Sequence, residues 1–470
     1  MAKKEPTVSW QVLLDDNQWE REAKAPGAAS ETTEALVHHM TGGMDMLTSR
    51  ERVRKTLAHQ EPDRVPLDLG GCGQTGMHVS SVYKLRQALG LDEPGVPVKV
   101  IEPYQMLGEI KPDLVDALGV DVMPLTGPKT LFGFVNQGWK PWTTFDGTPV
   151  LVPEAFNTEP QPGGEILMYP EGDRSVPPSG IMPNGGWYFD SIVRQPPLDE
   201  DRLNVADNLE EFGPISEAEL AHFGREAERL YSETDKAIFA VFGGIGFGDI
   251  ALVPAMWLKH PKGIRDIEEW YVSTAIRKEY VYAIFERQCE IGLANLEKLY
   301  AVVGDRVDLV HTTGTDFGTQ RAPFISTQSY RDLFKPFHTA INDWIHTHTS
   351  WKVLMHTDGA ILPLIPEFIE AGFDVLNPVQ YTAAGMDRAT IKQRFGDSLT
   401  FWGAGVDTQQ TLPFGTPEQI RAEVQENMRI FGPEGGFVFS SVHNVQPQTP
   451  VENLRAMYAA VAEYRQYPLG

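Results

Sequence analysis

Residues 352–379, KVLMHTDGAILPLIPEFIEAGFDVLNPV, decide the fold. They begin with a short apolar run at 352–356, which ends in polar residues. A helical pattern follows at 361–371, and Gly372 ends it before a second apolar run at 375–379. Continuous apolar runs of four to six residues suit parallel strands that are buried on both faces. The stretch therefore predicts a strand–helix–strand unit of an α/β protein.

The same pattern recurs along the chain. Apolar runs that stop at Gly, Pro or polar residues lie at 65–69, 121–125, 237–242, 307–312, 352–356, 375–379, 399–402 and 436–440. Helical patterns separate most of these runs, and the clearest is 278–303, where apolar residues recur every three or four positions. Further helices are predicted at 50–57 with Ser49 as the N-cap, at 417–431 and at 450–464. Eight strands alternating with helices predict a (β/α)8 TIM barrel.

Two segments do not follow the barrel pattern. Residues 1–46 are mostly polar and weakly patterned, so we predict an N-terminal extension, with one short helix at most, before a barrel at 47–466. Residues 128–215 carry closely spaced turn signals, such as PGG at 162–164 and NGG at 184–186, between β-type runs. We predict that 128–215 forms an antiparallel, β-rich insertion over the barrel mouth. A functional lid and a purely structural decoration are both open.

Composition narrows the class of protein. The chain has 40 Lys and Arg against 64 Asp and Glu, a formal charge of −24, and such a surface repels nucleic acid and anionic lipid. Only two cysteines occur in 470 residues, which indicates a reducing compartment rather than a disulfide framework. No apolar run approaches 18 residues and no signal peptide is evident, so we predict a cytoplasmic protein without a membrane span.

Candidate functional residues are the polar side chains that follow the predicted strands, because barrel enzymes bind their substrates where strands end. These are Asp316, Gln320, His356, Asp358, Asn377, Gln380, Asp407, His443 and Asn444. His356 and Asp358 are two residues apart, a spacing that puts both on one face at a strand end. Such a pair could bind Zn²⁺, with His443 and Asp316 completing the site, or act as a base with its orienting partner. Taken singly, each residue has a structural alternative, such as a turn at Asp358-Gly359.

Several segments together resemble a known family. They are TSRERV at 48–53, PDRVP at 62–66, DFGTQ at 316–320, EAGFDVLNPVQ at 370–380, WGAGVDTQ at 402–409 and HNVQP at 443–447. The set resembles the uroporphyrinogen decarboxylase superfamily, and within it the branch of cobalamin-linked methyltransferase-like proteins. The resemblance extends over residues 47–466 and implies a (β/α)8 barrel, in agreement with the strand count.

The departures from the family pattern bear on the reaction. The decarboxylases of the family that this chain resembles carry an Arg-rich motif after the first strand and a catalytic Asp after the next. This chain reads GGCGQ at 70–74, without Arg, and PLTG at 124–127, without Asp. The methyltransferase branch holds zinc through a His-x-Cys pair and a later Cys. This chain matches at His356 but has Asp358 and His443 at the other two positions, so thiolate–zinc chemistry is not supported. A harder metal site of nitrogen and oxygen ligands and a metal-free site in which Asp358 contacts the substrate are both open.

The resemblance therefore predicts a methyltransferase or demethylase that moves a methyl group from a small ether or amine to a corrinoid. Zinc or another divalent metal would be held by His356, Asp358 and His443, and Asp316 joins His356 and Asp358 as a catalytic residue. The predicted substrate contacts are Gln320, Asn377, Gln380, Asp407, His443 and Asn444. No Asp-x-His-x-x-Gly corrinoid motif is present, so the corrinoid would arrive on a partner protein. A decarboxylase of another substrate, a non-catalytic binding protein and a homodimeric assembly are open alternatives.

Overall fold

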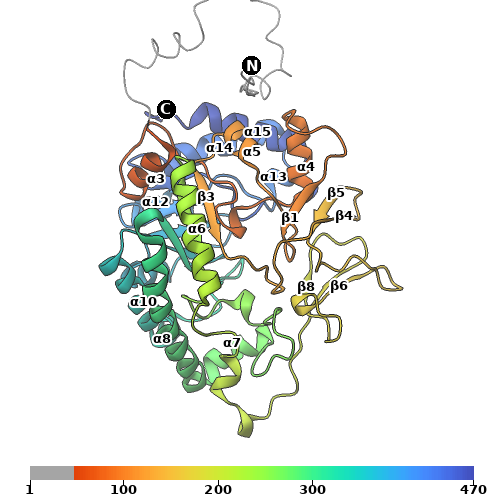
Figure 1. Ribbon diagram of the computed structural model, residues 1–470. Coiled ribbons are helices and arrows are strands. Elements are labelled where there is room, and N and C mark those ends of the chain that lie inside the picture. Colours follow the sequence, from red (N-terminus) through yellow and green to blue (C-terminus); the bar gives the residue numbers. More distant parts are fainter. Residues whose placement is uncertain (1–46, 470) are drawn as a thin grey trace, which may run out of the picture.

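A parallel β-sheet of seven strands forms the centre of the computed structural model, which describes residues 47–469 (Figure 1). Its spatial order is β14-β13-β12-β11-β10-β9-β3. The strands are β3 (Val122–Thr126), β9 (Ala237–Val241), β10 (Leu309–Thr313), β11 (Lys352–His356), β12 (Val375–Asn377), β13 (Thr400–Trp402) and β14 (Phe437–Val438). Each of these coincides with a predicted strand to within a few residues. The extension predicted at 1–46 lies outside the described residues.

The eighth predicted strand, at 65–69, closes the sheet into a barrel. On one side, Asp68 N donates to Phe439 O at 2.8 Å, and Phe439 N donates to Pro66 O at 2.8 Å. On the other side, Asp121 N donates to Leu67 O at 2.8 Å, just before β3 begins. The segment thus bridges the two edges of the sheet, and the predicted (β/α)8 barrel is confirmed.

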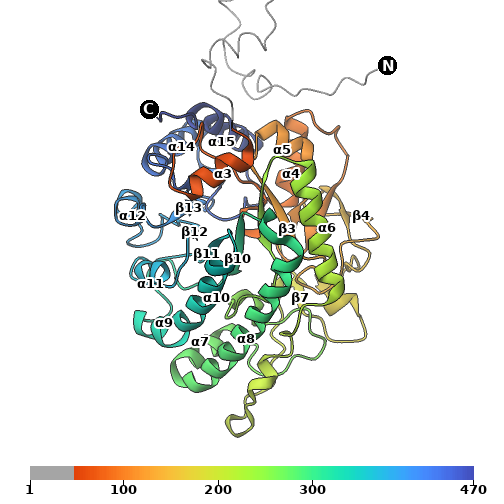
Figure 2. The ribbon, with the colours of Figure 1, turned by 60° about the vertical axis from the view of Figure 1, so that its left-hand side comes forward.

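Helices surround the barrel (Figure 2). They include α3 (Ser49–Leu57), α4 (Val79–Ala88), α5 (Pro112–Leu118), α6 (Glu217–Glu233), α7 (Ile267–Ile276), α8 (Lys278–Val303), α9 (Thr327–Leu333), α10 (Lys335–His348), α11 (Ile365–Glu370), α12 (Arg388–Phe395), α13 (Thr411–Phe414), α14 (Pro417–Phe431) and α15 (Val451–Tyr464). Both α8 and α14 match their predicted bounds. The predicted N-cap Ser49 is wrong by one residue, because Thr48 and Glu51 form a reciprocal capping box. In the described part of the chain, no helix has the length and apolar content needed to cross a bilayer.

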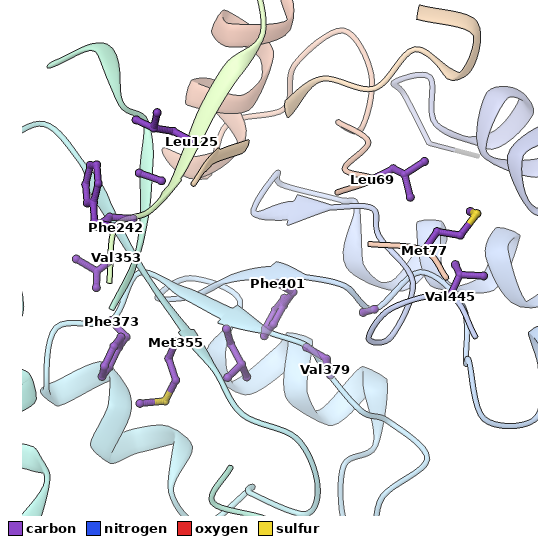
Figure 3. Packing of buried hydrophobic residues seen from close by; sticks show 14 of the residues in the cluster. Leu69, Met77, Leu125, Phe242, Val353, Met355, Phe373, Val379, Phe401 and Val445 are labelled. Atoms are coloured by element: carbon purple, nitrogen blue, oxygen red, sulfur yellow. The ribbon is translucent and has the colours of Figure 1, made fainter. Parts of the chain in front are cut away.

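Alternate residues of the strands divide the apolar core in two. On β11, Val353 and Met355 belong to the larger cluster, which includes the outer helices (Figure 3). Leu354, between them, belongs to a separate cluster inside the barrel. Val53 and Leu57 of α3 join this inner cluster, so α3 plugs the amino-terminal end of the barrel. The opposite end, where the strands finish, is left for polar residues.

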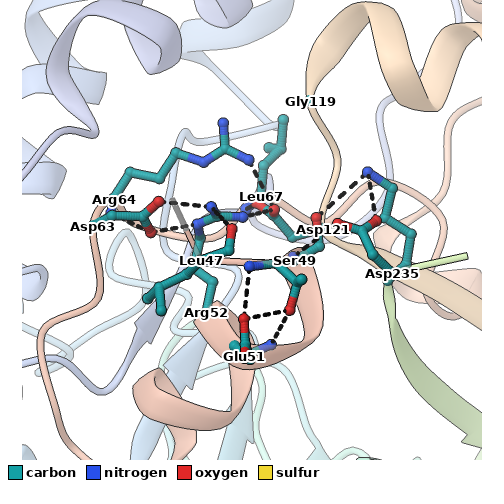
Figure 4. Close-up of polar contacts among 12 residues, drawn as sticks. Leu47, Ser49, Glu51, Arg52, Asp63, Arg64, Leu67, Gly119, Asp121 and Asp235 are labelled. Carbon is teal, nitrogen blue, oxygen red and sulfur yellow. Dashed lines mark hydrogen bonds and ion pairs between the residues drawn. The ribbon is translucent and has the colours of Figure 1, made fainter. Parts of the chain in front are cut away.

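Buried ion pairs hold the plugged end together (Figure 4). Arg52 of α3 contacts Asp121 at 2.6 Å and Asp63 at 2.7 Å, and Arg64 contacts Asp121 at 2.9 Å. The second carboxylate oxygen of Asp121 accepts the backbone N–H of Leu67 at 3.0 Å. These charges therefore link α3 to two neighbouring strands at their starting ends.

The β-rich insertion predicted at 128–215 forms parts of two small sheets. β6 (Ile166–Met168), β7 (Gly180–Met182) and β8 (Asp190–Ser191) form an antiparallel sheet. β4 (Lys140–Thr143) and β5 (Pro149–Val152) instead join β1 (Val98–Glu102) and β2 (Leu107–Gly108), which precede the predicted boundary. The parallel pairing of β1 with β5 depends on contact between distant segments, which local sequence patterns do not reveal.

Candidate functional site

Three potential metal ligands converge at the carboxyl ends of the strands. His356 is the last residue of β11 and lies two positions after the interior residue Leu354, so its side chain points into the barrel. Asp358 follows in the next turn, and His443 comes from the loop after β14. Donor atoms of His356, Asp358 and His443 all lie within 4.8 Å of one another. The structure thus brings together residues that are 87 positions apart at the extremes, 356 and 443.

The spacing of these donors suits a shared cation better than direct hydrogen bonds. Asp358 Oδ2 lies 3.8 Å from His356 Nε2 and 3.8 Å from His443 Nε2. Hydrogen bonds between such atoms are shorter than about 3.2 Å. Ligands held tetrahedrally around Zn²⁺ at about 2.1 Å are separated by about 3.4 Å. The two imidazole rings have centroids 5.4 Å apart and are tilted by 60°, so neither ring stacks on the other.

A hydrogen-bonded chain fixes the tautomer of His356. Asn377 Nδ2 donates to the backbone oxygen of Trp402 at 2.8 Å, which orients the amide and turns its Oδ1 toward His356 Nδ1 at 2.7 Å. Because Oδ1 can only accept, Nδ1 carries the proton, and Nε2 presents its lone pair to the cluster. An outer partner of this kind is typical of imidazole ligands in metal sites.

Trp402 extends these hydrogen bonds to a buried carboxyl group, that of Asp68. The indole nitrogen of Trp402 donates to Asp68 Oδ2 at 2.7 Å, and Gly71 N donates to Asp68 Oδ1 at 2.8 Å. Burial inside the barrel raises the pKa of Asp68 to about 6, although both donors oppose the shift. The side chains of His356, Asn377, Trp402 and Asp68 are thus held in register across the barrel interior.

Asn444 and its neighbours position His443. His443 has a φ of +68°, the backbone N–H of Asn444 donates to its Nδ1 at 2.9 Å, and the same Nδ1 lies 2.9 Å from Asn444 Oδ1. Nε2 has a lone pair for a cation only in the other tautomer, in which Nδ1 gives up the bond from the backbone N–H and donates to Oδ1 instead. Asn444 Nδ2 donates to Gln105 Oε1 at 2.8 Å, and Asn444 Oδ1 accepts from Gln446 Nε2 at 2.8 Å. Asn444 therefore supports a candidate ligand and has few groups left for a substrate.

Asp316 lies beside the cluster in the loop after β10. Its Oδ1 accepts the backbone N–H of Asp358 at 2.9 Å. Burial raises the pKa of Asp316, and the charge of Asp358 adds to the rise, whereas His356 and His443 lower it. The loops of Asp316 and Asp358 touch at Gly359, which has a φ of +90° and whose Cβ, if present, would lie 2.4 Å from the backbone of Gly318. Only glycine permits this approach.

The other predicted substrate contacts are occupied by structural hydrogen bonds or lie outside the cluster. Asn377 is 1% exposed, and both ends of its amide are occupied by His356 and Trp402. Gln380 is buried and accepts the N–H of Gly359. Asp407 is 1% exposed and accepts backbone N–H groups at 409–411, where it caps the turn before α13. Gln320 is exposed on the hairpin at 318–323. These four residues have structural positions that explain their polarity.

Three further polar residues lie near the cluster: His311, which begins the polar run after the predicted strand, and Asp249 and Tyr271, which were not singled out from the sequence. His311 of β10 has a buried Nε2 without a hydrogen-bond partner, and burial together with the charge of His356 lowers its pKa to about 3. Tyr271 of α7 donates from its hydroxyl to the backbone oxygen of Asp316 at 2.5 Å. The charges of Asp316 and Asp249 both raise the pKa of Tyr271 further after burial has raised it. No local sequence pattern marks Asp249 or Tyr271.

The donor set fits a divalent metal. Two imidazole nitrogens and one carboxylate oxygen suit zinc and also harder first-row metals, because no soft thiolate is present. Both cysteines are buried elsewhere, Cys72 inside the barrel and Cys289 on α8. A surface cavity of about 310 Å³ lies between α8 and residues 209–214, and none of the cluster residues line it.

We expect replacement of Asn377 by leucine to lower metal affinity about 10–100-fold, as the loss of an outer hydrogen bond to a ligating histidine typically does. The substitution keeps the side-chain volume but leaves His356 Nδ1 without its acceptor. Competition with a chelator of known affinity would measure the change. Asn184, which is exposed in the insertion, supplies the matched control Asn184→Leu. Equal affinities for the Asn377 and Asn184 variants would contradict the orienting role.

Comparison with known proteins supports the family resemblance. Residues 314–464 match the family model of uroporphyrinogen decarboxylase. The uroporphyrinogen decarboxylase of Coxiella burnetii is 27% identical over 120 residues, which cover 24% of this chain and 32% of that enzyme. That of Methylococcus capsulatus is 32% identical over 95 residues, covering 20% and 25% of the two chains. The matched segment thus spans about a third or less of the curated relatives.

A methyltransferase from Methanosarcina mazei aligns in structure over 89% of this chain and 99% of that protein, with a TM-score of 0.49 and 16% sequence identity. The predicted resemblance to the superfamily is confirmed over residues 314–464 by the family model and the curated relatives. This segment contains Asp316, His356, Asp358 and His443. It leaves out the ends of the first two strands, where the sequence departs from the decarboxylase pattern.

Proposed function

We propose that this protein is a methyltransferase. It would remove a methyl group from a small methylated substrate and pass it to a corrinoid on a separate protein. The carboxyl-terminal part of the chain matches the uroporphyrinogen decarboxylase family, which is consistent with this proposal. One observation carries the proposal. The donors of His356, Asp358 and His443 converge at the positions where the methyltransferase branch, by resemblance, holds its metal. The convergence supports a metal-assisted reaction at the barrel mouth.

In this proposal, His356, Asp358 and His443 hold a divalent metal, and Asn377 keeps His356 Nε2 turned toward it. The bound metal would supply a Lewis acid that polarises the heteroatom carrying the methyl group. Three protein ligands leave room for a substrate atom, as in catalytic rather than structural zinc sites. The aliphatic and aromatic residues below the cluster, such as Leu354 and Trp402, exclude water from its inner side.

Asp316 is suited to manage the proton. In the transfer, the bond between the methyl carbon and the heteroatom breaks, and its electron pair stays on the heteroatom. The carbon takes an electron pair from the reduced cobalt of the corrinoid. A carboxylic acid with a raised pKa can protonate the departing heteroatom, and burial raises the pKa of Asp316 in this way. Its second oxygen stays anchored to the N–H of Asp358 during the step.

The test uses the full-length protein loaded with zinc or cobalt, a chemically reduced corrinoid and a panel of methyl ethers and methylamines. We expect the absorption of methylated corrinoid to appear with at least one substrate. Asp316→Asn should slow its formation by about 100-fold, the usual contribution of general acid catalysis, while Asp305→Asn, on the surface, should not. No methylated corrinoid across the panel would refute the proposal.

A decarboxylase of another substrate is the second candidate, because the curated relatives are uroporphyrinogen decarboxylases. The end of the first strand reads GGCGQ at 70–74, without the arginines that would bind a substrate with many carboxylates. Release of carbon dioxide in the absence of any corrinoid would favour this candidate. Its dependence on Asp316 but not on the metal would separate it from methyl transfer.

A further inference from the structure

The β-rich insertion contributes a hydroxyl group to the surroundings of His443. Tyr188, which lies just before β8, donates from its hydroxyl to Gln446 Oε1 at 2.5 Å. Gln446 belongs to the loop after β14, the same loop that carries His443. A hydrogen bond across 258 positions of sequence thus joins the insertion to the loop of a candidate metal ligand.

Packing on both sides fixes the two partners of this hydrogen bond. The ring of Tyr188 meets the imidazole of His78 edge to face, with centroids 5.6 Å apart. The next residue, Phe189, is 2% exposed and is buried among other aromatic rings of the insertion. On the other side, the backbone oxygen of Gln446 accepts from the hydroxyl of Ser81 at 2.9 Å. The fold therefore holds the Tyr188 hydroxyl and the Gln446 amide against each other.

A backbone group fixes which way the Gln446 amide is turned. Its Nε2 donates to the backbone oxygen of Asn444 at 3.0 Å, and because a backbone oxygen can only accept, this end of the amide is the nitrogen. The same Nε2 donates to Asn444 Oδ1 at 2.8 Å, while Asn444 Nδ2 donates to Gln105 Oε1 at 2.8 Å. The side-chain oxygen of Asn444 therefore faces both Gln446 and His443. The hydroxyl of Tyr188 occupies the other end of the Gln446 amide.

Two groups of Asn444 compete for Nδ1 of His443. The backbone N–H donates to it at 2.9 Å, an arrangement that leaves the proton of the neutral ring on Nε2. Oδ1, also at 2.9 Å, can instead accept a proton from Nδ1. Only this second arrangement leaves a lone pair on Nε2, the atom that lies 3.8 Å from Asp358 Oδ2. The balance between the two tautomers therefore depends on how firmly Asn444 Oδ1 is held beside the ring.

We infer that the insertion is a positioning element for His443. Acting through Gln446 and Asn444, Tyr188 favours the tautomer whose Nε2 can bind a cation. The inference deepens the proposed function and rests on its metal site. Without the hydroxyl, Gln446 Oε1 loses its donor, so the amide can turn and release Asn444 Oδ1. The backbone N–H of Asn444 stays in place, and the tautomer with the proton on Nε2 gains.

Nitrogen-15 spectra of the metal-free, full-length protein with labelled histidine test the inference. Protonated and unprotonated ring nitrogens differ in chemical shift, and in mildly alkaline solution the rings are neutral. The signals of His443 are those that disappear in His443→Gln. We expect Nδ1 to carry the proton in the wild-type protein, and Tyr188→Phe to raise the fraction of rings protonated at Nε2. A wild-type ring protonated mainly at Nε2, or an unchanged ratio in Tyr188→Phe, would overturn the inference.

Zinc affinity gives a second, independent readout. Competition with a chelator of known affinity should show about three- to tenfold weaker binding in Tyr188→Phe, the usual contribution of one hydrogen bond. Tyr169→Phe is the matched control, because it removes a half-buried hydroxyl directly after β6 in the same insertion and outside this network. It should leave both the His443 spectrum and zinc affinity unchanged. Equal zinc affinities of the two phenylalanine variants would overturn the inference.

A double variant tests the route through Gln446. Gln446→Leu should weaken zinc binding at least as much as Tyr188→Phe, and combining the two should cause little further loss, because the hydroxyl acts only through that amide. Fully additive losses would overturn this route. If the tautomer and the affinity respond as expected but no substrate methylates a corrinoid, the proposed function fails while the positioning role stands. Methyl transfer with a tautomer ratio that ignores Tyr188→Phe would overturn the positioning role alone.

Discussion

Replacement of His356 by alanine is expected to remove the bound divalent metal and with it nearly all methyl transfer. The cluster offers only three protein ligands, so the loss of one leaves two, which cannot hold a metal against dilution. Loss of an outer partner alone costs about 10–100-fold in affinity, and loss of the ligand itself should exceed that. Elemental analysis of the purified protein should give about one metal per chain, falling to near zero in the variant.

A matched set of substitutions separates this effect from general damage. His348→Ala removes an exposed histidine of α10 and should keep both metal and activity. Asp358→Cys should retain a metal and shift its preference toward zinc, because thiolate is the softer ligand. In cobalt-loaded protein this exchange would add a sulfur-to-metal absorption band. A His356→Ala protein that keeps a full complement of metal would show that the three residues do not form the site.

Replacement of Arg52 by methionine is expected to destabilise the fold by about 3 kcal/mol, the lower end of the usual cost of breaking a buried ion pair, because Asp121 keeps Arg64 as its remaining counter-ion. Arg52 is 2% exposed, and its partner Asp121 is fully buried. Its guanidinium contacts both oxygens of Asp63, one oxygen of Asp121 and the backbone oxygen of Leu47. Without it, α3 loses its main polar attachment to the plugged end of the barrel.

The midpoint of urea denaturation, followed by fluorescence and circular dichroism together, measures this loss. Arg229→Met removes an exposed arginine that pairs with Glu226 on α6, and should change stability by less than about 0.5 kcal/mol. Burial raises the pKa of Asp121, but the charges of Arg64 and Arg52 lower it by more than burial raises it, so the pKa in the folded protein lies below its usual value. The stability from this carboxylate is thus present above its unfolded pKa and is lost as pH falls through the folded value. A midpoint unchanged in Arg52→Met would contradict the proposed attachment.

Local patterns were sufficient for the barrel because its elements are local. Each strand is a short apolar run bounded by turn residues, and α8 shows its apolar face at every third or fourth position. The helix predicted at 361–371 proved shorter, since α11 begins only at Ile365, where Pro366 can occupy the first turn. The small sheet that joins β1 to β5 was not predictable, because its register depends on contacts between segments about 50 residues apart.

Part of the candidate site could be predicted from local patterns, and part of it could not. Sequence patterns were enough to predict that polar residues follow the strands, and that His356 and Asp358 share a face at the end of one of them. They could not determine which of those residues meet, because that depends on barrel closure and on the rotation of each side chain. Only the tertiary structure brings His443 to Asp358 and turns Asn377 toward His356.

The tertiary structure also decided which polar residues are used for the fold itself. Asp407 caps the turn before α13, so its carboxylate accepts backbone N–H groups and does not join the cluster at the barrel mouth. Asp249 and Tyr271 enter from the segment between β9 and α8, where the sequence has no motif to mark them. Apolar periodicity follows from the geometry of single elements and is readable in one dimension. A binding site requires distances between elements, and these exist only after the chain has folded.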